Sequence, residues 1–216
     1  MAWFGADPGG MDKFGVALLD PDGSFESAVV SCAEEAIEWL AKTGASIEAA
    51  GIDAPLWWSS GRTGYRKSDQ RIRNGYDGLG STVLSLNSLW GAALVQGVMT
   101  AVLLRERFRE VSITECHPKA LLKAWGIDPT DLDASWKKAR EHFELADGPS
   151  RTDHERDALI AAAAAREGAA GRWRCDLAKK RCAFEQDPDL VPWGPVSYWW
   201  PKELSDVNEI ECIYKD

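Results

Sequence analysis

The sequence has no long apolar run and no recognisable export signal. No stretch approaches the roughly 18 consecutive apolar residues that a membrane-spanning helix requires. The opening residues, Met-Ala-Trp-Phe-Gly-Ala-Asp, have neither the basic start nor the apolar core of a secretion signal. We therefore expect a cytoplasmic protein that makes no membrane contact.

Cysteine is scarce and scattered. The five cysteines form no Cys-x-x-Cys pair and no Cys/His cluster with the spacing typical of zinc sites. An odd number of dispersed cysteines without an export signal indicates reduced thiols. Neither structural zinc nor a disulfide framework is expected at these positions, which are Cys32, Cys116, Cys175, Cys182 and Cys212.

Excess positive charge is also absent. The 216 residues include 25 Lys and Arg against 34 Asp and Glu, which gives a formal net charge of -9. Overall attraction to nucleic acid or to an anionic membrane is therefore excluded as the main driving force of binding, although a local basic patch can still contact phosphates. The length and the 45% hydrophobic content fit one globular domain.

The first part of the sequence has the pattern of a mixed sheet. Apolar runs at residues 3–6, 14–19 and 25–31 are separated by Pro-Gly-Gly and Asp-Pro-Asp-Gly turns, which predicts an antiparallel meander. Residues 33–42 have the apolar spacing of a helix, and residues 49–54 have the pattern of a buried strand. Strand, helix and strand in this order favour a right-handed crossover.

The middle of the sequence is mainly helical in pattern. Apolar spacing predicts helices over residues 86–108, 132–145 and 153–168, with a further strand over residues 111–116. Pro118 is expected to begin a short helix, because proline suits the first helical position. Together these elements predict an α/β fold.

The last segment is rich in tryptophan and has no long element. The chain contains 11 tryptophans, and the tail has only short strand-like pieces. These pieces are residues 173–175, 181–184 and 196–200. We therefore expect one domain over residues 1–170 and an irregular or hairpin extension over residues 171–216 packed on it.

Three carboxylates end predicted strands. Asp7 precedes a Pro-Gly-Gly turn, Asp53 precedes Ala-Pro, and Glu115 precedes Cys-His-Pro. If these strands are parallel neighbours, their ends lie at one edge of the sheet, about 5 Å apart per strand. At such short distances the negative charge of each acid raises the pKa of its neighbours, unless a cation lies between them. A single such acid is most simply a turn residue, whereas three at matching positions favour a site.

The helix predicted over residues 153–168 supplies a fourth acid. Thr152 and Glu155 form a capping-box pattern that marks its start. Asp157 shares a face with Ile160, Ala161 and Ala164, and the small residues at 161–165 allow the helix to approach the sheet closely. An acid on that face would be buried without a partner unless a cation is present.

Two residues in the first turn of this helix have alternative interpretations. Asp153 is either an acid that favours the positive end of the helix or a member of the site. His154 is interpreted as an exposed or capping residue in preference to a catalytic one.

A basic, glycine-rich segment occupies residues 57–82. Its length and composition predict a loop that is either functional or simply solvated. Trp57 and Trp58, at its start, either stack a nucleobase or cover the end of the sheet. The candidate phosphate-binding residues are Arg62, Arg66, Lys67, Arg71 and Arg73.

Four segments together resemble the domain-of-unknown-function 429 family of predicted ribonuclease-H-like nucleases. They are Gly-Ala-Asp-Pro-Gly-Gly at 5–10, Gly-Ile-Asp-Ala-Pro-Leu at 51–56, Glu-Cys-His-Pro at 115–118 and His-Glu-Arg-Asp-Ala at 154–158. The last is also similar to the helix that ends the active site of Holliday-junction resolvases. The resemblance covers about residues 3–170, and the tail has no counterpart.

The resemblance implies a ribonuclease-H-like fold, with three antiparallel strands followed by two parallel ones in a five-stranded mixed sheet flanked by helices. The strand order above agrees with it. It also implies that Asp7, Asp53 and Asp157 are the metal-binding acids, with Glu115 or Asp153 completing the set. The basic segment resembles the arginine-bearing loop of that family.

The leading hypothesis is hydrolysis of a phosphodiester with two Mg²⁺ or Mn²⁺ ions about 4 Å apart. The substrate is expected to be nucleic acid, held by the basic segment, or a small phosphate-containing compound. One alternative is a non-catalytic binding module in which the acids hold a structural ion or pair with Arg73, Lys119 or Arg156. Another is an actin-like phosphotransferase, suggested by the glycine-rich turn after Asp7 and disfavoured by the chain length.

Overall fold

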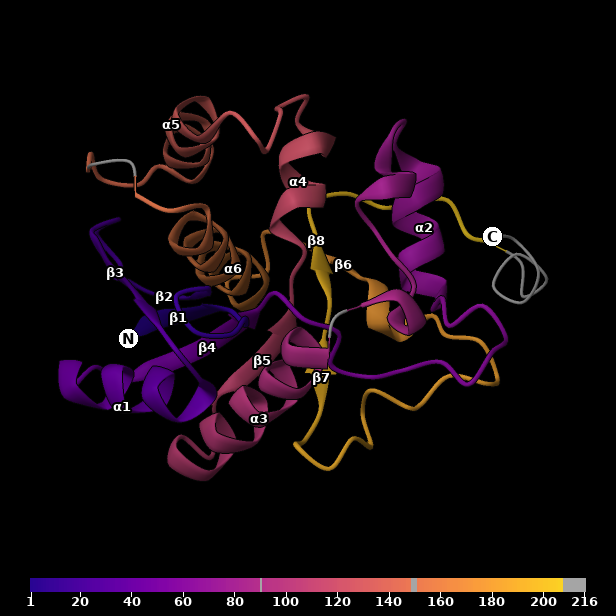
Figure 1. Ribbon diagram of the computed structural model, residues 1–216, viewed down its shortest axis with the longest axis horizontal. Helices are drawn as coiled ribbons and strands as arrows, with labels where there is room; N and C mark the ends of the chain where they lie inside the picture. Colours follow the sequence, from indigo (N-terminus) through magenta and orange to yellow (C-terminus); the bar gives the residue numbers. More distant parts are fainter. Residues whose placement is uncertain (90, 149–150, 208–216) are drawn as a thin grey trace.

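The core of the protein is a six-stranded mixed sheet with the strand order β3–β2–β1–β4–β5–β7 (Figure 1). The computed structural model describes residues 1–89, 91–148 and 151–207. The first three strands are antiparallel, and β1, β4, β5 and β7 are parallel. The strands are β1 (Ala2–Asp7), β2 (Phe14–Leu19), β3 (Phe25–Val30), β4 (Ile47–Ile52), β5 (Ser112–Glu115) and β7 (Val196–Ser197).

This topology confirms the predicted ribonuclease-H-like arrangement of β1 to β5, including the adjacency of the strands that precede Asp7, Asp53 and Glu115. The sixth strand is a correction to the predicted five. It comes from the tail, where Val196 pairs with Ile113 of β5. A two-residue strand is too short to have a detectable period, and its pairing covers what would otherwise be an exposed sheet edge.

The rest of the tail folds back on the main body. Strand β6 (Cys175–Asp176) pairs with β8 (Trp199–Trp200) in a separate two-stranded sheet. Residues 181–184, predicted as strand-like, form no strand, and the neighbouring Glu185 makes only an isolated bridge with Ser59. Cys32, Cys116 and Cys175 are free thiols, as expected, and Cys212 lies outside the described residues.

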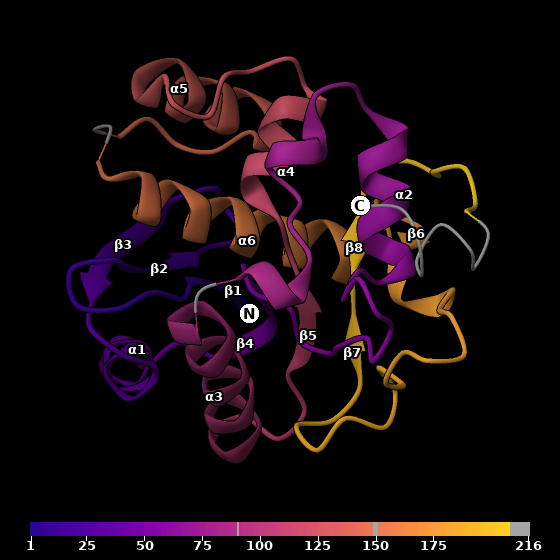
Figure 2. The ribbon, with the colours of Figure 1, turned by 45° about the vertical axis from the view of Figure 1, so that its right-hand side comes forward.

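Helices cover both faces of the sheet. Figures 1 and 2 show α6 across one face, α1 and α3 against the other, and α4 and α5 beside α6. Within the described part of the chain, no helix is long and apolar enough to cross a membrane. The helices are α1 (Ala33–Thr43), α2 (Lys67–Gly75), α3 (Gly91–Arg107), α4 (Pro118–Ala124), α5 (Leu132–Phe143) and α6 (Asp153–Ala169), with short 3-10 turns at Leu79–Ser81, Leu86–Ser88 and Leu177–Lys179.

Helix α6 lies very close to the sheet. Its alanines at positions 158 and 161–165 are buried, and a Cβ on Gly5, Gly15 or Gly51 would collide with the α6 backbone. The predicted capping box of Thr152 and Glu155 is present and begins the helix. This close approach brings the first turns of α6 to the ends of β1 and β4.

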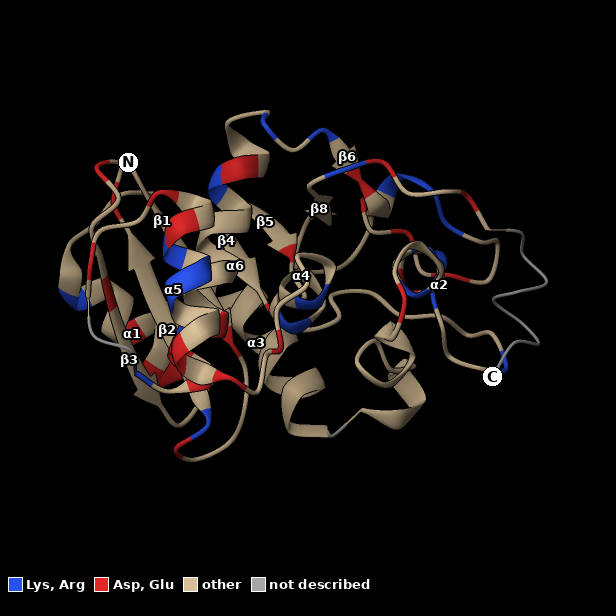
Figure 3. Cartoon of the chain, turned by 90° about the horizontal axis from the view of Figure 1, so that it is seen from above, with Lys and Arg blue, Asp and Glu red and all other residues tan. Residues whose placement is uncertain are grey.

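The segment over residues 57–82, predicted as a loop that is either functional or solvated, is not simply a solvated loop. It contains α2, and Arg66 and Arg71 are among the largest fully buried side chains. Figure 3 shows charged positions on helices and connections around a largely uncharged sheet. Buried carboxylates and carbonyl groups accept from these arginines, which allows a polar helix to pack inside the protein.

Candidate functional site

The acids predicted from the sequence meet at one edge of the sheet. Asp7 is the last residue of β1, and Asp53 follows β4, with its backbone N–H donating to Ala6 O at 2.8 Å. Asp157 reaches the same edge from the second turn of α6. Burial, followed by the charges of Asp7 and Asp157, raises the pKa of Asp53 well above its usual value. Asp7, Asp53 and Asp157 therefore come to one edge of the sheet and interact electrostatically, and their role as a metal site stays a prediction.

Asp157 is held on one side only. Its Oδ1 accepts from Arg156 Nε at 2.8 Å and from Arg156 Nη2 at 2.6 Å, and both side chains are completely buried. Its Oδ2 is buried and has no hydrogen-bond partner among the described residues. Burial and the charge of Asp7 raise the pKa of Asp157 to about 6, against the opposing effect of Arg156.

Asp7 is paired with a histidine that the sequence interpretation placed elsewhere. His154 Nδ1 lies 2.7 Å from Asp7 Oδ2. Burial raises the pKa of Asp7, opposed by this hydrogen bond, and the same bond raises the pKa of His154. The interpretation of His154 as an exposed or capping residue is therefore wrong. The available signal was its spacing, because residues 154 and 157 lie on adjacent positions of one helical face.

Lys119 enters the sequence analysis only in the alternative of a binding module, as a partner of the acids. The structure shows that it and Arg156 do pair with Asp157, whereas Arg73 donates elsewhere. Lys119 Nζ lies 3.5 Å from Asp157 Oδ2 and 3.9 Å from Asp153 Oδ2. Burial lowers the pKa of Lys119, but the charges of Asp157, Asp53 and Asp7 outweigh it and leave the pKa raised. Asp153 is half-exposed at the rim of this group, with Lys119 and His154 as its charged neighbours.

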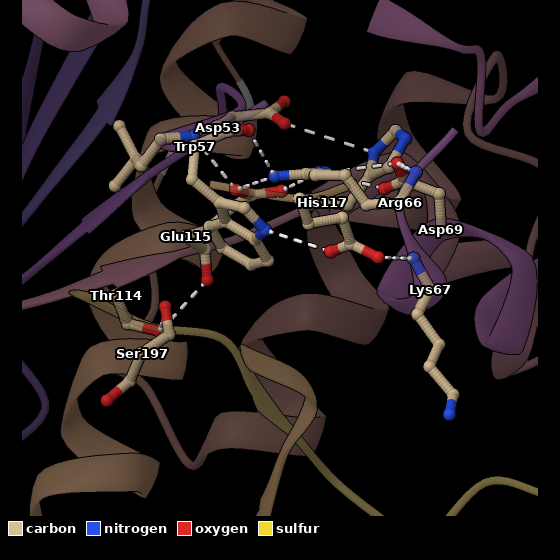
Figure 4. Close-up of polar contacts among 11 residues, drawn as sticks. Asp53, Trp57, Arg66, Lys67, Asp69, Thr114, Glu115, His117 and Ser197 are labelled. Atoms are coloured by element: carbon tan, nitrogen blue, oxygen red, sulfur yellow. Dashed lines mark hydrogen bonds and ion pairs between the residues drawn. The ribbon is translucent and has the colours of Figure 1, made fainter. Parts of the chain in front are cut away.

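Glu115 occupies the same edge but is already neutralised. Arg66 donates to both of its oxygens, at 2.6 and 2.7 Å, and Leu56 N donates at 3.0 Å (Figure 4). The same guanidinium binds Asp69 through Nε at 3.0 Å and Nη2 at 2.8 Å. Burial raises the pKa of Glu115, against the effect of Arg66. Glu115 thus belongs to a separate, satisfied ionic group.

The remaining basic residues of the 57–82 segment are partly used inside the protein. Arg71 donates to Leu204 O at 2.8 Å, and Arg73 donates to Gly80 O and Val83 O at 2.7 Å. Lys67 forms an ion pair with Asp206 at 3.2 Å, and Arg62 is exposed. A phosphate-binding role for these residues stays a prediction, since the buried guanidinium groups already have acceptors.

The two tryptophans that begin this segment lie differently. Trp57 is buried, with the Arg66 guanidinium 4.2 Å above its ring and its Nε1 donating to Glu185 at 3.3 Å. Trp58 is 53% exposed and lines an apolar groove of about 520 Å³ beside α3. Trp57 therefore covers the end of the sheet, while base stacking by Trp58 stays a prediction.

A cavity of about 200 Å³ opens beside the acids. Asp7, Asp53 and Lys119 line it, and so do His117, the ionic group of Arg66, Asp69 and Glu115, and apolar side chains that include residues of the segment before α3. His117 Nδ1 is 3.9 Å from Asp53 Oδ1, and burial lowers the pKa of His117 to about 4. The imidazole is therefore neutral at pH 7 and does not compensate the charge of Asp53.

The donor set matches the ligands that a hard divalent cation prefers. Mg²⁺ and Mn²⁺ bind carboxylate oxygens, and here Asp157 Oδ2 is buried without a hydrogen-bond donor. Across the described residues, no three His, Cys, Asp or Glu side chains are already grouped as a metal site. The acids fit such a cation in chemistry, with the Lys119 ammonium beside the oxygen that would bind it.

Comparisons with known proteins find a similarity in structure and none in sequence. No family model matches the chain, and no curated protein matches it. The structure is similar to that of RuvC from Thermus thermophilus, with 15% sequence identity, 79% of this chain and 97% of the RuvC chain covered, and a TM-score of 0.43. Membership of the domain-of-unknown-function 429 family therefore stays a prediction, and the site is argued from the residues of this chain.

Proposed function

We propose that the protein is a divalent-cation-dependent phosphodiester hydrolase with Asp7, Asp53 and Asp157 as its metal-binding acids. The observation that carries this proposal is the convergence of three acids, Asp157 completely buried, Asp7 buried and Asp53 partly buried, in which one oxygen, Asp157 Oδ2, has no hydrogen-bond donor among the described residues. A buried carboxylate oxygen whose nearby cation is a partly exposed lysine is incompletely compensated, so such a group favours binding of a further cation. Mg²⁺ or Mn²⁺ suits carboxylate oxygens better than a softer metal does. A divalent ion bound by these acids would activate a water molecule and stabilise the leaving oxygen.

The neighbouring side chains fix the geometry of the acids. Arg156 anchors Asp157 through Oδ1 and leaves Oδ2 directed toward Lys119. His154 holds Asp7 Oδ2 at 2.7 Å and so restricts the rotation of that carboxylate. Asp153, at the rim, is proposed as an outer acid of the site.

Glu115 is proposed as a positioning residue. Both of its oxygens accept hydrogen bonds from Arg66, which leaves little capacity for a metal. Through Leu56 N it holds the chain immediately after Asp53. Its contribution to hydrolysis is therefore to keep the ends of β4 and β5 in register with the acids.

The substrate class is proposed to be nucleic acid or a smaller phosphodiester. The cavity beside Asp53 is the proposed position of the scissile phosphate, because it is lined by Asp7, Asp53 and the ammonium of Lys119. With a formal net charge of -9, the protein depends on such local cations to attract an anion.

A cleavage assay tests the proposed function. Purified protein is incubated with single-stranded and duplex DNA and RNA and with bis(p-nitrophenyl) phosphate, in Mn²⁺, in Mg²⁺ or in EDTA. We expect metal-dependent cleavage of at least one substrate by the wild type and by Asp133→Asn, which changes an exposed acid on α5. Asp53→Asn should abolish it. Equal cleavage by Asp53→Asn, or cleavage in EDTA, would contradict the proposal.

A further inference from the structure

The strongest unexplained feature of the acid site is the lysine beside it. Lys119 Nζ lies 3.5 Å from Asp157 Oδ2, the one oxygen of Asp157 without a hydrogen-bond partner. We infer that Lys119 is the built-in counter-cation of this site and that its ammonium and a divalent cation exclude one another there. This inference rests on the proposed function and extends it to the metal-free state.

The position of Lys119 is not explained by its own helix. Helix α4 has Pro118 at its first position, which places Lys119 in the first turn. Unpaired N–H groups make that end of a helix positive, so a lysine there is locally unfavourable. The acids across the cavity must therefore supply the compensating attraction, and Asp53 and Asp7 line the same cavity as Lys119.

Two cations contact Asp157, and only one of them can leave. Arg156 is completely buried and also donates to Pro129 O and Ser135 Oγ, both at 2.8 Å. The Lys119 side chain is 42% exposed and ends in a flexible chain that can reach solvent. Arg156 thus fixes the carboxylate through Oδ1, and Lys119 occupies the exchangeable position at Oδ2.

Exclusion follows from distance and charge. A Mg²⁺ ion binds a carboxylate oxygen at about 2.0–2.1 Å. An ammonium 3.5 Å from the same oxygen would lie within about 5.6 Å of that ion, where two like charges beside a buried carboxylate repel each other. Binding of the ion must therefore drive the ammonium outward, where it lines the mouth of the cavity and is available to a substrate phosphate.

The inference predicts two opposite effects of Lys119→Met. Without metal, the acids lose their mobile counter-ion, and the melting temperature should fall by several degrees. With metal, the competitor is gone, and the Kd for Mn²⁺ should fall by about tenfold or more, within the usual range of coupling between two ligands. A merely structural ion pair would give the first effect without the second.

The test is calorimetric titration of the metal-free full chain with MnCl₂, together with melting curves. Lys123→Met is the matched control, because it removes the same charge from the same helix at a side chain that instead donates to Thr82 Oγ1 at 2.6 Å. Lys119→Gln provides the same comparison if Lys119→Met does not fold. We expect tighter Mn²⁺ binding for the Lys119 variants and wild-type affinity for Lys123→Met.

The outcomes separate this inference from the proposed function. Equal or weaker Mn²⁺ binding by the Lys119 variants would overturn the exclusion while leaving the metal site in place. Tighter binding by Lys123→Met to the same extent would also overturn it, because net charge alone would then explain the change. Absence of Mn²⁺ binding to the wild type and to both Lys119 variants would overturn the proposed function as well.

Discussion

Two ionic groups lie side by side at the end of the sheet, and they are built differently. In the closed group, formed by Arg66, Asp69 and Glu115, one guanidinium is bonded to both carboxylates (Figure 4). The open group has three buried or partly buried acids and a partly exposed lysine as a mobile cation, apart from His154 on Asp7 and Arg156 on Asp157. The open group consists of Asp7, Asp53, Asp157 and Lys119.

The difference separates a structural role from a binding role. Where every charged atom has a short partner, as around Arg66, the group holds segments together and has no capacity left for a ligand. Where an acid such as Asp53 has no bonded cation and one buried oxygen of Asp157 has no hydrogen bond among the described residues, the arrangement is stable only with an added cation or a shifted pKa. Strand-end acids of similar appearance in the sequence therefore have different functions.

The largest expected loss of stability comes from removing the arginine of the closed group. Arg66→Leu leaves Asp69 and Glu115 buried without their cation, and should lower the free energy of unfolding by about 3–5 kcal/mol. Urea denaturation measures it. Arg62→Leu, at an exposed position nearby in sequence, should change stability by no more than about 0.5 kcal/mol. Similar small losses in both variants would show that the closed group is not structural.

A smaller loss of stability is expected at Asp157, an acid of the open group that also has a buried arginine as its partner. Asp157→Asn removes the charge opposite the buried Arg156, which keeps its bonds to Pro129 and Ser135, and should cost about 2 kcal/mol. It should also abolish Mn²⁺ binding, measured by calorimetry. Retained Mn²⁺ affinity would remove Asp157 from the metal-binding set and leave it as a partner of Arg156.

The smallest effect is expected at the rim of the open group. Asp153 is half-exposed, and Asp153→Asn should change the free energy of unfolding by less than about 0.5 kcal/mol. Its effect on Mn²⁺ affinity should be severalfold at most, because the inner acids remain. Complete loss of binding in the same titration would instead place Asp153 among the direct ligands.

The sheet and the open group were predictable because both depend on local pattern. Apolar runs ending in Asp7 and Asp53 determine where the strands stop, and the capping box at Thr152 sets the start of α6. Strand adjacency then follows from the right-handed crossover. The acids thus come together as a consequence of the strand order, which could be predicted from the sequence pattern.

The closed group and the lysine were not predictable in this way. Arg66 and Glu115 are 49 positions apart, and no periodicity indicates that they pair. Without that pairing, α2 has the composition of a solvated basic loop. Lys119 likewise has no signal in its own helix, because the acids that attract it come from β1, β4 and α6. In both cases the position of the side chain depends on charged partners that are distant in the sequence.

The central claim is that the open group binds a cation, and Asp53 tests it most directly. Unlike Asp157, Asp53 has no cation bonded to its carboxylate among the described residues. The imidazole of His117 lies 3.9 Å from Asp53 Oδ1, but it is neutral at pH 7. Asp53→Asn should therefore relieve repulsion from Asp7 and Asp157, so that the metal-free variant melts at or above the wild-type temperature.

The deciding measurement is the melting temperature of wild type and Asp53→Asn with and without Mn²⁺. At a concentration about a hundred times Kd, Mn²⁺ should raise the wild-type melting temperature by about 5–10 °C, because only the folded state binds it. Asp53→Asn should not respond, and Asp133→Asn should respond like the wild type. A metal-free Asp53→Asn variant that melts well below the wild type, or one that Mn²⁺ stabilises equally, would contradict the account.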